Sequence, residues 1–405
     1  MTLRLGACRW LSHCPHPALR RLAGLAWAPV VASGLAVAAC DTASIPAAPT
    51  SVSTDQVSLT PIAQTSEWPA STPDAEGLDP DVLTDLVRKL RRGEFGSVSS
   101  VLVVRNDRLV LEEYNGWSSS RPHTLQSVTK SVTSLVVGLA IADGRLSVTD
   151  RITPLASSYE PIAAMDQWKG AMSVRDLLTM RSGFDWREWP YAGSPLERVN
   201  TCHCDWLRLI LDWPMREQPG TRWEYVSGAP ILLAGVVGFV TGRQFDDYAA
   251  ERLFKPLGTV SERWAMYSSA PPGLPHTGGG LYMRPRDMAK IGSLVLNEGA
   301  WQGIQIVPPD WIRESTGRVV SSPPAGWPHP VDYGYLWWLM SLTDPMNARP
   351  EPGDVIVAAG AQGQWIMVAP RYRLVMTATG ETDNDFGRMY APNFFYTHVL
   401  ASVRR

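Results

Sequence analysis

The order of hydrophobic patterns along the chain restricts its fold more than any other feature of the sequence. Residues 99–114 alternate apolar and polar side chains around Asn106-Asp107, which predicts a β-hairpin with a tight turn. A long stretch with mostly helical periodicity follows, and strand patterns return from Tyr333. A helical middle between strands at both ends predicts that the two terminal segments share one sheet. We therefore expect an α/β (α+β) fold in which helices flank an antiparallel sheet and a helical domain is inserted.

This pattern also gives the expected domain boundaries. The sheet domain is predicted over residues 70–150 and 330–405, and the helical domain over 151–329. A helix over 125–142 follows the hairpin and ends at Asp143-Gly144, a pair typical of a helix C-terminus. Another helix is predicted to begin at the capping box Ser173–Asp176, and further helices are predicted over 229–241, 245–254, 285–297, 309–315 and 392–403. The later strands are predicted over 333–340, 355–359, 364–369 and 373–379.

Composition excludes several classes of protein. With 405 residues, 45% of them apolar and 19% charged, the chain can bury a sizeable core and is not expected to be disordered. A formal net charge of −2 gives no reason to expect a nucleic-acid partner. Only five of the 37 basic residues are lysines, so a lysine in a special setting stands out.

The N-terminal segment is expected to be a signal peptide rather than part of the fold. Residues 1–39 carry four arginines, no acidic residue and an apolar run that ends just before Cys40. The last residues of this run resemble the lipobox of bacterial lipoproteins, in which the cysteine is diacylated, and Asp41 resembles an inner-membrane retention signal. The alternative is a signal anchor, because an apolar run of 18 residues can also span a bilayer.

Residues 40–69 are predicted to form the lipidated Cys40 and a flexible tether. Ala, Pro, Ser, Thr and Gln dominate this segment without periodicity. Cleavage before Cys40 would leave 33 basic and 39 acidic residues, a formal charge of −6. The predicted location is therefore the bacterial cell envelope, as a periplasmic lipoprotein anchored in the inner membrane through Cys40.

The segment Cys202-His203-Cys204 has two interpretations. It could be half of a metal site, but no second cysteine pair or His-x-x-x-His completes one. Buried thiols or a local disulfide are the better interpretation. We expect neither a metal nor a cofactor.

Three short motifs carry the expected chemistry. Ser127-Val128-Thr129-Lys130 lies at the start of a predicted helix, where residues three apart share a face and the lysine amine can reach the serine hydroxyl. Burial and the partial positive charge of a helix N-terminus both lower a lysine pKa, which would make the amine a proton acceptor. A motif this short also arises by chance, so two further segments matter. They are Tyr225-Val226-Ser227, which precedes a predicted helix, and residues 360–364 (Gly-Ala-Gln-Gly-Gln), which meet a predicted strand.

Together these motifs resemble those of the serine β-lactamase and penicillin-binding-protein superfamily. The nearest likeness is to its class C-like branch, which includes esterases, D-peptidases and 6-aminohexanoate-dimer (nylon-oligomer) hydrolases. The resemblance covers about residues 68–399, and further matching segments lie at 177–183, 253–258, 278–281 with Arg286-Asp287, and 333–338.

The resemblance implies a role for each motif residue. Ser127 would be the acylated nucleophile, Lys130 its proton acceptor, and Tyr225 a phenol that relays protons to the leaving group. Whether Lys130 or Tyr225 takes the first proton stays open at this point. The backbone N–H groups of Ser127 and Gln364 would form the oxyanion hole.

Two departures from the β-lactamase pattern concern the substrate. Ala361-Gln362-Gly363 stands where β-lactamases have Lys-Thr-Gly, so the cation that helps to hold a substrate carboxylate is missing. Ser227 stands where an asparagine is frequent, which removes an amide that would bind the acyl side chain. Efficient β-lactam hydrolysis is therefore not expected, and both departures resemble those of esterases and nylon-oligomer hydrolases.

Several residues are weaker candidates for substrate binding. Ser227, Gln362 and Gly363 are included by position in the motifs. Asp185 and Tyr191 lie in a loop that borders the active site in the nylon-hydrolase-like group, where an acid, Asp185 or Glu188, would receive a substrate amine and Tyr191 would close over the acyl-enzyme. A solvated surface loop is the alternative.

Three further residues have mainly structural interpretations. His276 either faces the cleft or is structural, as a single histidine beside glycines more often is. Trp337 and Trp338 point to opposite faces of a predicted strand, so one is expected in the core and the other at the pocket mouth.

The sequence thus predicts an envelope-tethered serine hydrolase that acts on esters or small amides through an acyl-enzyme on Ser127. One alternative is a β-lactamase or D-alanyl-D-alanine peptidase of the penicillin-binding-protein type. The other is a non-catalytic sensor with the same fold, which the presence of all three of Ser127, Lys130 and Tyr225 argues against.

Overall fold

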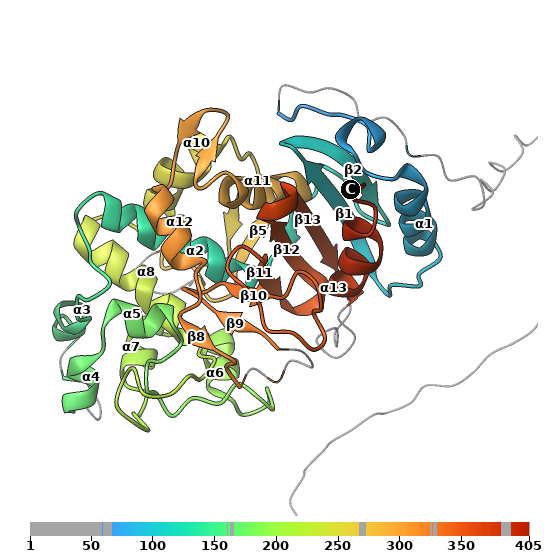
Figure 1. Ribbon diagram of the computed structural model, residues 1–405. Helices are drawn as coiled ribbons and strands as arrows, with labels where there is room; N and C mark the ends of the chain where they lie inside the picture. Colours follow the sequence, from blue (N-terminus) through green and yellow to red (C-terminus); the bar gives the residue numbers. More distant parts are fainter. Residues whose placement is uncertain are drawn as a thin grey trace, which may run out of the picture. The chain divides into compact units, whose positions relative to one another are not determined.

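The computed structural model describes residue 59 and residues 67–159, 161–162, 166–266, 273–324, 326, 330–381 and 390–404 (Figure 1). The predicted signal peptide, Cys40 and most of the predicted tether lie outside these residues, so the lipid anchor stays a prediction.

The described chain contains the expected antiparallel sheet. Eight strands are ordered β2-β1-β13-β12-β11-β10-β9-β8, with the N-terminal hairpin next to the last strand in sequence. The hairpin turn lies at Asn106 and Asp107, whose φ angles of 51° and 64° are those of a tight hairpin turn. The strands are β1 (Val98–Arg105), β2 (Arg108–Tyr114), β8 (Val320–Ser321), β9 (Asp332–Tyr333), β10 (Trp338–Met340), β11 (Val355–Gly360), β12 (Gln364–Ala369) and β13 (Leu374–Gly380).

Helices cover the sheet because its central strands are apolar on both faces. Strands β11, β12 and β13 are buried along their whole length. Helices α2 (Val128–Ala142) and α11 (Pro285–Leu296) pack against one face of the sheet. On the other face lie α1 (Pro80–Arg91) and the C-terminal helical segment, which consists of α13 (Tyr390–Phe394) and Phe395–Leu400 (Figure 1). The predicted fold class is confirmed.

Helices are the main secondary structure of the described residues between 151 and 329. Two strands of this region, β4 (Arg263–Trp264) and β5 (Leu281–Met283), pair with β3 (His123–Thr124), which precedes α2, in a small three-stranded sheet. Two other segments of this region belong with the large sheet instead, namely β8 and helix α11. The remaining helices are α3 (Thr153–Ser157), α4 (Gln167–Ala171), α5 (Val174–Leu178), α6 (Pro195–Thr201), α7 (Trp206–Leu211), α8 (Gly228–Thr241), α9 (Phe245–Ala249), α10 (Lys255–Leu257) and α12 (Pro309–Ser315), and the remaining strands are β6 (Ala300–Trp301) and β7 (Ile304–Gln305).

The predicted strand over 333–340 is wrong in its middle. Strands β9 and β10 are separated by a turn in which the Gly334 N–H donates to the Trp337 carbonyl oxygen, and Leu336 has a φ of 64°. The turn is held by distant partners, because the Leu336 N–H donates to the carbonyl oxygen of Leu178. Partners from another part of the chain thus break a strand that the local pattern predicts as continuous.

The predicted helix over 245–254 runs further than expected. Residues 250–254 form a wider helical turn after α9, and the helix ends only at Gly258, whose φ is 66°. Pro256 is tolerated because it lies in the first turn of α10, where an N–H need not be paired within the helix.

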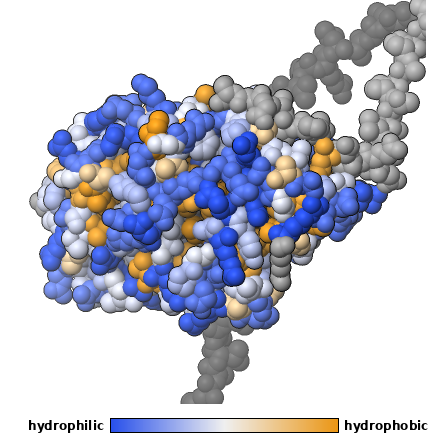
Figure 2. All heavy atoms as spheres, turned by 45° about the horizontal axis from the view of Figure 1, so that its top comes forward, coloured by the Kyte–Doolittle hydropathy of each residue, from blue (hydrophilic) through white to orange (hydrophobic). Residues whose placement is uncertain are grey.

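Membrane-spanning potential in the described residues is limited to one bent pair of helices. No single described helix is long and apolar enough to cross a bilayer, while Gly228–Thr241 and Phe245–Leu257 pass on length and composition together but are bent by 79°. On the face of the described chain shown in Figure 2, hydrophilic side chains surround small, separate apolar patches.

Candidate active site

The start of helix α2 brings Ser127 and Lys130 together. Gln126 has a φ of 48°, and this turn presents Ser127 at the first position before the helix. The Lys130 Nζ donates hydrogen bonds to the Ser127 Oγ over 2.9 Å and to the carbonyl oxygen of Gly278. The predicted serine–lysine contact is therefore present.

Burial makes the Lys130 amine a usable base. Lys130 is 2% exposed, and this burial lowers its pKa to about 8, while the charge of Glu188 acts in the opposite direction. At pH 7 about a tenth of the amines are then neutral, whereas an exposed lysine is almost entirely protonated. The neutral amine can accept the Ser127 proton.

Tyr225 lies against the same amine. The Lys130 Nζ is 4.8 Å from the centroid of the Tyr225 ring, and the ring stacks on Trp338 with 6.0 Å between centroids. Burial raises the pKa of Tyr225, the charge of Glu188 adds to this, and a hydrogen bond with Ser127 lowers it. Tyr225 is therefore a neutral phenol at neutral pH, able to donate a proton.

Both tryptophans of the pair at 337–338 are buried, so neither is at a pocket mouth as one of them was expected to be. Trp337 is fully buried and Trp338 is 5% exposed. The turn between β9 and β10 removes the alternation of faces that a continuous strand would give. Trp338 instead supports the Tyr225 ring.

Glu188 holds the segment that carries Tyr225. Its carboxylate accepts hydrogen bonds from the Ser227 N–H, from the Ser227 Oγ over 3.1 Å and from the Trp186 Nε1 over 2.9 Å. Burial raises the pKa of Glu188, whereas Lys130 and these hydrogen bonds lower it. The hydroxyl of Ser227, predicted to bind substrate, is thus bound to Glu188.

The third motif reaches the nucleophile through a close backbone contact. A Cβ at Gly360 would lie 2.4 Å from the carbonyl oxygen of Leu125, so glycine alone allows β11 to approach the start of α2. Gln362 (φ 63°) and Gly363 (φ 87°) then turn the chain into β12. The Gln364 side chain fixes this turn by donating to the carbonyl oxygens of Gln362 and Gly380.

The two backbone donors predicted for the oxyanion hole lie at the start of α2 and at the start of β12, and their role stays a prediction. The N–H groups of Val128, Thr129 and Lys130 donate to the carbonyl oxygens of residues 125–127, while the Ser127 N–H has no partner among the residues that the structure describes. Gln364, the other predicted donor, is fully buried at the first position of β12. An unpaired N–H beside the Ser127 hydroxyl is what an oxyanion needs.

In the loop at 185–191, Asp185 and Tyr191 are exposed, whereas Glu188 is buried beside the motif residues. Asp185 is exposed, and within the described chain it makes only backbone hydrogen bonds. Tyr191 is 38% exposed, and its hydroxyl accepts a hydrogen bond from the Asn200 Nδ2 over 3.2 Å. Their substrate-binding roles stay predictions, and Glu188 is the acid of this loop that reaches the motif residues.

His276 and the two cysteines have structural contacts. His276 is 9% exposed, hydrogen-bonds through Nε2 to the Asn200 Oδ1 over 2.9 Å, and contacts the Trp206 ring. Burial lowers the pKa of His276 to about 4. Cys202 and Cys204 form a disulfide, and no cluster of potential metal ligands occurs within the described ranges.

Comparison with known proteins agrees with the fold and with the family that the sequence resembles. The family model named Beta-lactamase matches residues 83–391, so the chain belongs to the β-lactamase family, a family of serine hydrolases. A 6-aminohexanoate-dimer hydrolase from Paenarthrobacter ureafaciens is 27% identical over 269 residues, which make up 63% of this chain and 66% of that protein. The match thus spans just under two thirds of this relative.

Solved structures show the same fold at low sequence identity. EstCE1, described as a hydrolase with promiscuous acyltransferase activity, has a TM-score of 0.64 and 16% identity, and the match covers 80% of this chain and all of that one. An octameric penicillin-binding-protein homologue from Pyrococcus abyssi has a TM-score of 0.59 and 17% identity, covering 79% of this chain and 76% of that one. At this identity the likeness concerns the fold alone.

Proposed function

We propose that the chain hydrolyses esters or small amides through an acyl-enzyme formed on Ser127. The observation that carries the proposal is the 2.9 Å hydrogen bond from the buried Lys130 amine, with its pKa near 8, to the Ser127 hydroxyl. The names of the relatives, a 6-aminohexanoate-dimer hydrolase and a hydrolase with acyltransferase activity, support the same reaction class.

Acylation begins with proton transfer from Ser127 to Lys130. The neutral amine takes the hydroxyl proton as Oγ attacks the substrate carbonyl carbon, and the carbonyl oxygen becomes an oxyanion held by the N–H groups of Ser127 and Gln364. Each such donor contributes roughly 3–4 kcal/mol in comparable hydrolases. Lys130 is the first acceptor because the Tyr225 phenol, with its raised pKa, is the weaker acid and holds its own proton.

Tyr225 completes the step by protonating the leaving group. As the bond from the carbonyl carbon to the leaving oxygen or nitrogen breaks, the phenol donates its proton and recovers one from the Lys130 ammonium beside it. A water molecule then attacks the acyl carbon and gives a proton to the Lys130 amine. The bond between the acyl carbon and the Ser127 Oγ breaks, Oγ takes that proton back from the ammonium, and the acid is released. The side chains end the cycle in their starting protonation states.

The third motif favours this reaction over β-lactam hydrolysis. No cationic side chain stands at residues 361–363, so the carboxylate that β-lactams carry has no partner within the motif. Ser227 offers a hydroxyl already bound to Glu188. Neither motif therefore offers the cation or the side-chain amide that β-lactam recognition would use.

The cellular location is part of the proposal and rests on the sequence. The basic start, the apolar run and the lipobox-like end before Cys40 support a lipid-anchored protein of the bacterial envelope. Globomycin treatment of cells that produce the full chain should accumulate the precursor if Cys40 is lipidated. Unchanged processing would contradict the anchor.

Intact-protein mass spectrometry tests the reaction. Residues 41–405 are exposed to 4-nitrophenyl acetate and, separately, to penicillin, with Ser127→Ala as control. We expect an acetyl adduct that the variant lacks and no penicilloyl adduct. A stable penicilloyl adduct would favour the penicillin-binding alternative, and labelling by neither compound nor by a fluorophosphonate would favour the non-catalytic sensor.

A further inference from the structure

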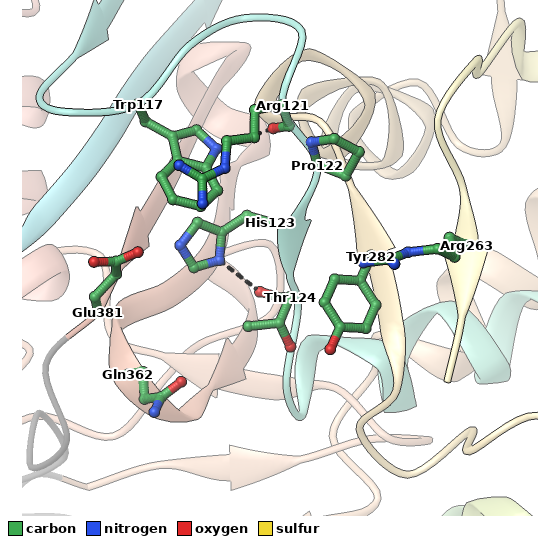
Figure 3. Close-up of a pocket in the computed structure, with 9 residues that line it drawn as sticks. All are labelled: Trp117, Arg121, Pro122, His123, Thr124, Arg263, Tyr282, Gln362 and Glu381. Atoms are coloured by element: carbon green, nitrogen blue, oxygen red, sulfur yellow. Dashed lines mark hydrogen bonds between the residues drawn. The ribbon is translucent and has the colours of Figure 1, made fainter. Parts of the chain in front are cut away.

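A pocket with several polar side chains lies beside the third motif. Its volume is about 730 Å³, and its lining includes Trp117, Arg121, His123, Arg263, Gln362 and Glu381 (Figure 3). These residues come from the loop before β3, from β3 and β4, and from the two ends of the β12–β13 region. The reaction proposed above does not use this pocket.

Two arginines give the pocket a positive character. The Arg121 guanidinium lies 3.7 Å from the Trp117 ring centroid, and the Arg263 guanidinium lies 4.3 Å from that of Tyr282. Neither arginine forms an ion pair with a carboxylate among the residues that the structure describes. Stacking orients a guanidinium while leaving its edge N–H groups available to a ligand.

A buried histidine faces the same space. His123 is 4% exposed, its Nδ1 donates to the Thr124 carbonyl oxygen over 3.0 Å, and its Nε2 is buried with no hydrogen-bond partner in the described chain. Burial lowers the pKa of His123, so the ring is neutral at pH 7. The buried, neutral ring adds no charge to the pocket, so the two arginines supply its positive charge.

The pocket is linked to the proposed nucleophile by a short contact. The Gln126 Nε2 donates to the Gln362 Oε1 over 3.2 Å, and Gln126 directly precedes Ser127. Strand β3, which also lines the pocket, leads within two residues into Gln126 and pairs with β5. The pocket therefore borders the segment that presents Ser127, next to the proposed nucleophile.

We propose that this pocket binds a carboxylate at one end of the substrate, with Arg121 and Arg263 as its partners. The proposal rests on the proposed function and adds a substrate class to it: esters or amides that carry a carboxylate. The two arginines supply, from other elements, the positive charge that residues 361–363 lack.

Glu381 provides an internal test because it opposes this binding. Its carboxylate lines the pocket on the side away from Arg263 (Figure 3) and interacts electrostatically with His123. If the ligand is an anion, Glu381 weakens its binding and each arginine strengthens it. Replacing these residues should change selectivity in opposite directions.

The experiment compares matched neutral and anionic esters. In the first pair the carboxylate is on the acyl side, and kcat/KM for mono(4-nitrophenyl) glutarate is divided by kcat/KM for 4-nitrophenyl pentanoate. In the second pair it is on the leaving side, and kcat/KM for 4-acetoxybenzoate is divided by kcat/KM for phenyl acetate. For at least one pair, we expect Arg121→Gln combined with Arg263→Gln to lower the ratio about tenfold, and Glu381→Gln to raise it about threefold.

A matched control is available elsewhere on the surface. Arg243 also lies over a tyrosine ring, at 5.9 Å from the Tyr248 centroid, but pairs with Glu251 outside the pocket. Arg243→Gln should leave both ratios unchanged. Ratios in the double arginine variant equal to those of the wild type, or a Glu381→Gln effect in the same direction as the arginine effect, would overturn the proposal.

A binding measurement separates this proposal from the proposed function. Calorimetric titration of Ser127→Ala with ethyl hydrogen glutarate needs no turnover, and we expect binding that the two arginine substitutions weaken about tenfold. If the wild type hydrolyses no ester but this binding occurs, the proposed function fails and the pocket assignment stands. If the wild type hydrolyses esters but neither binding nor selectivity depends on the two arginines, the proposed function stands and the pocket assignment fails.

Discussion

Two buried lysines show how the neighbours of an amine decide what it can do. Lys130 on α2 and Lys290 on α11 are each 2% exposed, and each donates a hydrogen bond to a glycine carbonyl oxygen, that of Gly278 or Gly258. Their helices pack against the same sheet. The two side chains differ in their remaining partners.

Lys290 lies among carboxylates. Its Nζ is 3.1 Å from Glu67 and 3.4 Å from Asp287, and Arg284 also pairs with Asp287 over 3.0 Å. Burial alone would raise the pKa of Asp287, but the hydrogen bonds from Arg284 and Ser261 outweigh it and hold this pKa below its usual range. The cluster is therefore a set of paired charges with a structural role.

Lys130 has a hydroxyl where Lys290 has carboxylates. Its second partner is the Ser127 Oγ, and Glu188 acts on it through its charge, without a salt bridge between them in the described residues. Burial without a paired carboxylate lowers the pKa of the amine to about 8. Removal of Lys130 should therefore abolish most activity and removal of Lys290 should not, whereas the two substitutions should change stability in opposite directions.

The largest difference is expected in activity. Lys130→Met removes the proton acceptor and should lower kcat/KM for 4-nitrophenyl acetate by roughly 10³-fold. Lys290→Met removes no reacting group, so the folded variant should retain activity within about threefold. Equal losses in the two folded variants would contradict the distinction between them.

Stability should change in opposite directions. The pKa of Lys130 is lower in the folded state than in the unfolded chain, so at pH 7 the unfolded state binds more protons. Burial of the amine therefore costs about 3 kcal/mol at pH 7. This cost disappears as the pH rises from about 8 to 10.5. Lys130→Met should therefore raise the free energy of unfolding at pH 7. Lys290→Met leaves Asp287 and Glu67 with fewer cations and should lower it by about 3 kcal/mol.

Denaturant unfolding at pH 7 with unchanged m-values measures both effects. The linkage also predicts that Lys130→Met loses its advantage over the wild type near pH 10. An advantage that is independent of pH would assign the gain to packing instead of to the amine.

Glu188→Gln tests whether the Tyr225 segment depends on a buried carboxylate. An amide cannot accept all three hydrogen bonds, so we expect kcat to fall about 10- to 100-fold through misplacement of Tyr225. Loss of the negative charge should also move the pH inflection assigned to Lys130 downward, because Glu188 raises the pKa of that amine. The exposed Glu351→Gln is the control, and an unchanged pH profile in Glu188→Gln would show that the effect is structural only.

The smallest effect is expected for Ser227→Ala. The variant loses the hydroxyl bond to Glu188, while the Ser227 N–H still donates to the same carboxylate. One lost hydrogen bond of this kind changes a free energy by about 1 kcal/mol, so kcat should fall about fivefold. A loss as large as that of Glu188→Gln would instead give the Ser227 hydroxyl a direct role with substrate.

Local signals in the sequence predicted much of the fold. The hairpin turn at Asn106-Asp107, the capping box at Ser173 and Asp176, and helix 309–315 are all present, because each depends on residues within a few positions of one another. The break in the predicted strand 333–340 could not be predicted. It depends on a backbone hydrogen bond to Leu178, more than 150 residues away.

The same limit applies to the candidate site. The spacing of Ser127 and Lys130 is a property of one helix, so their contact follows from the sequence. The choice between Asp185 and Glu188 depends on which side chain reaches Ser227 after the loop folds, and no local pattern distinguishes the two acids. The pocket at Arg121 and Arg263 joins segments about 140 residues apart and was likewise absent from the sequence predictions.

The pH dependence of Ser127 acylation tests the role of Lys130 most directly. Single-turnover acetylation by 4-nitrophenyl acetate is followed from pH 5.5 to 10.5 in the wild type and in Lys130→Met. Because the base must be unprotonated, the wild-type rate should rise with pH through one inflection near pH 8, and the variant should lack this inflection. An inflection near pH 8 that persists in Lys130→Met, or a wild-type rate without an inflection below pH 10, would contradict the assignment of the buried amine as the base.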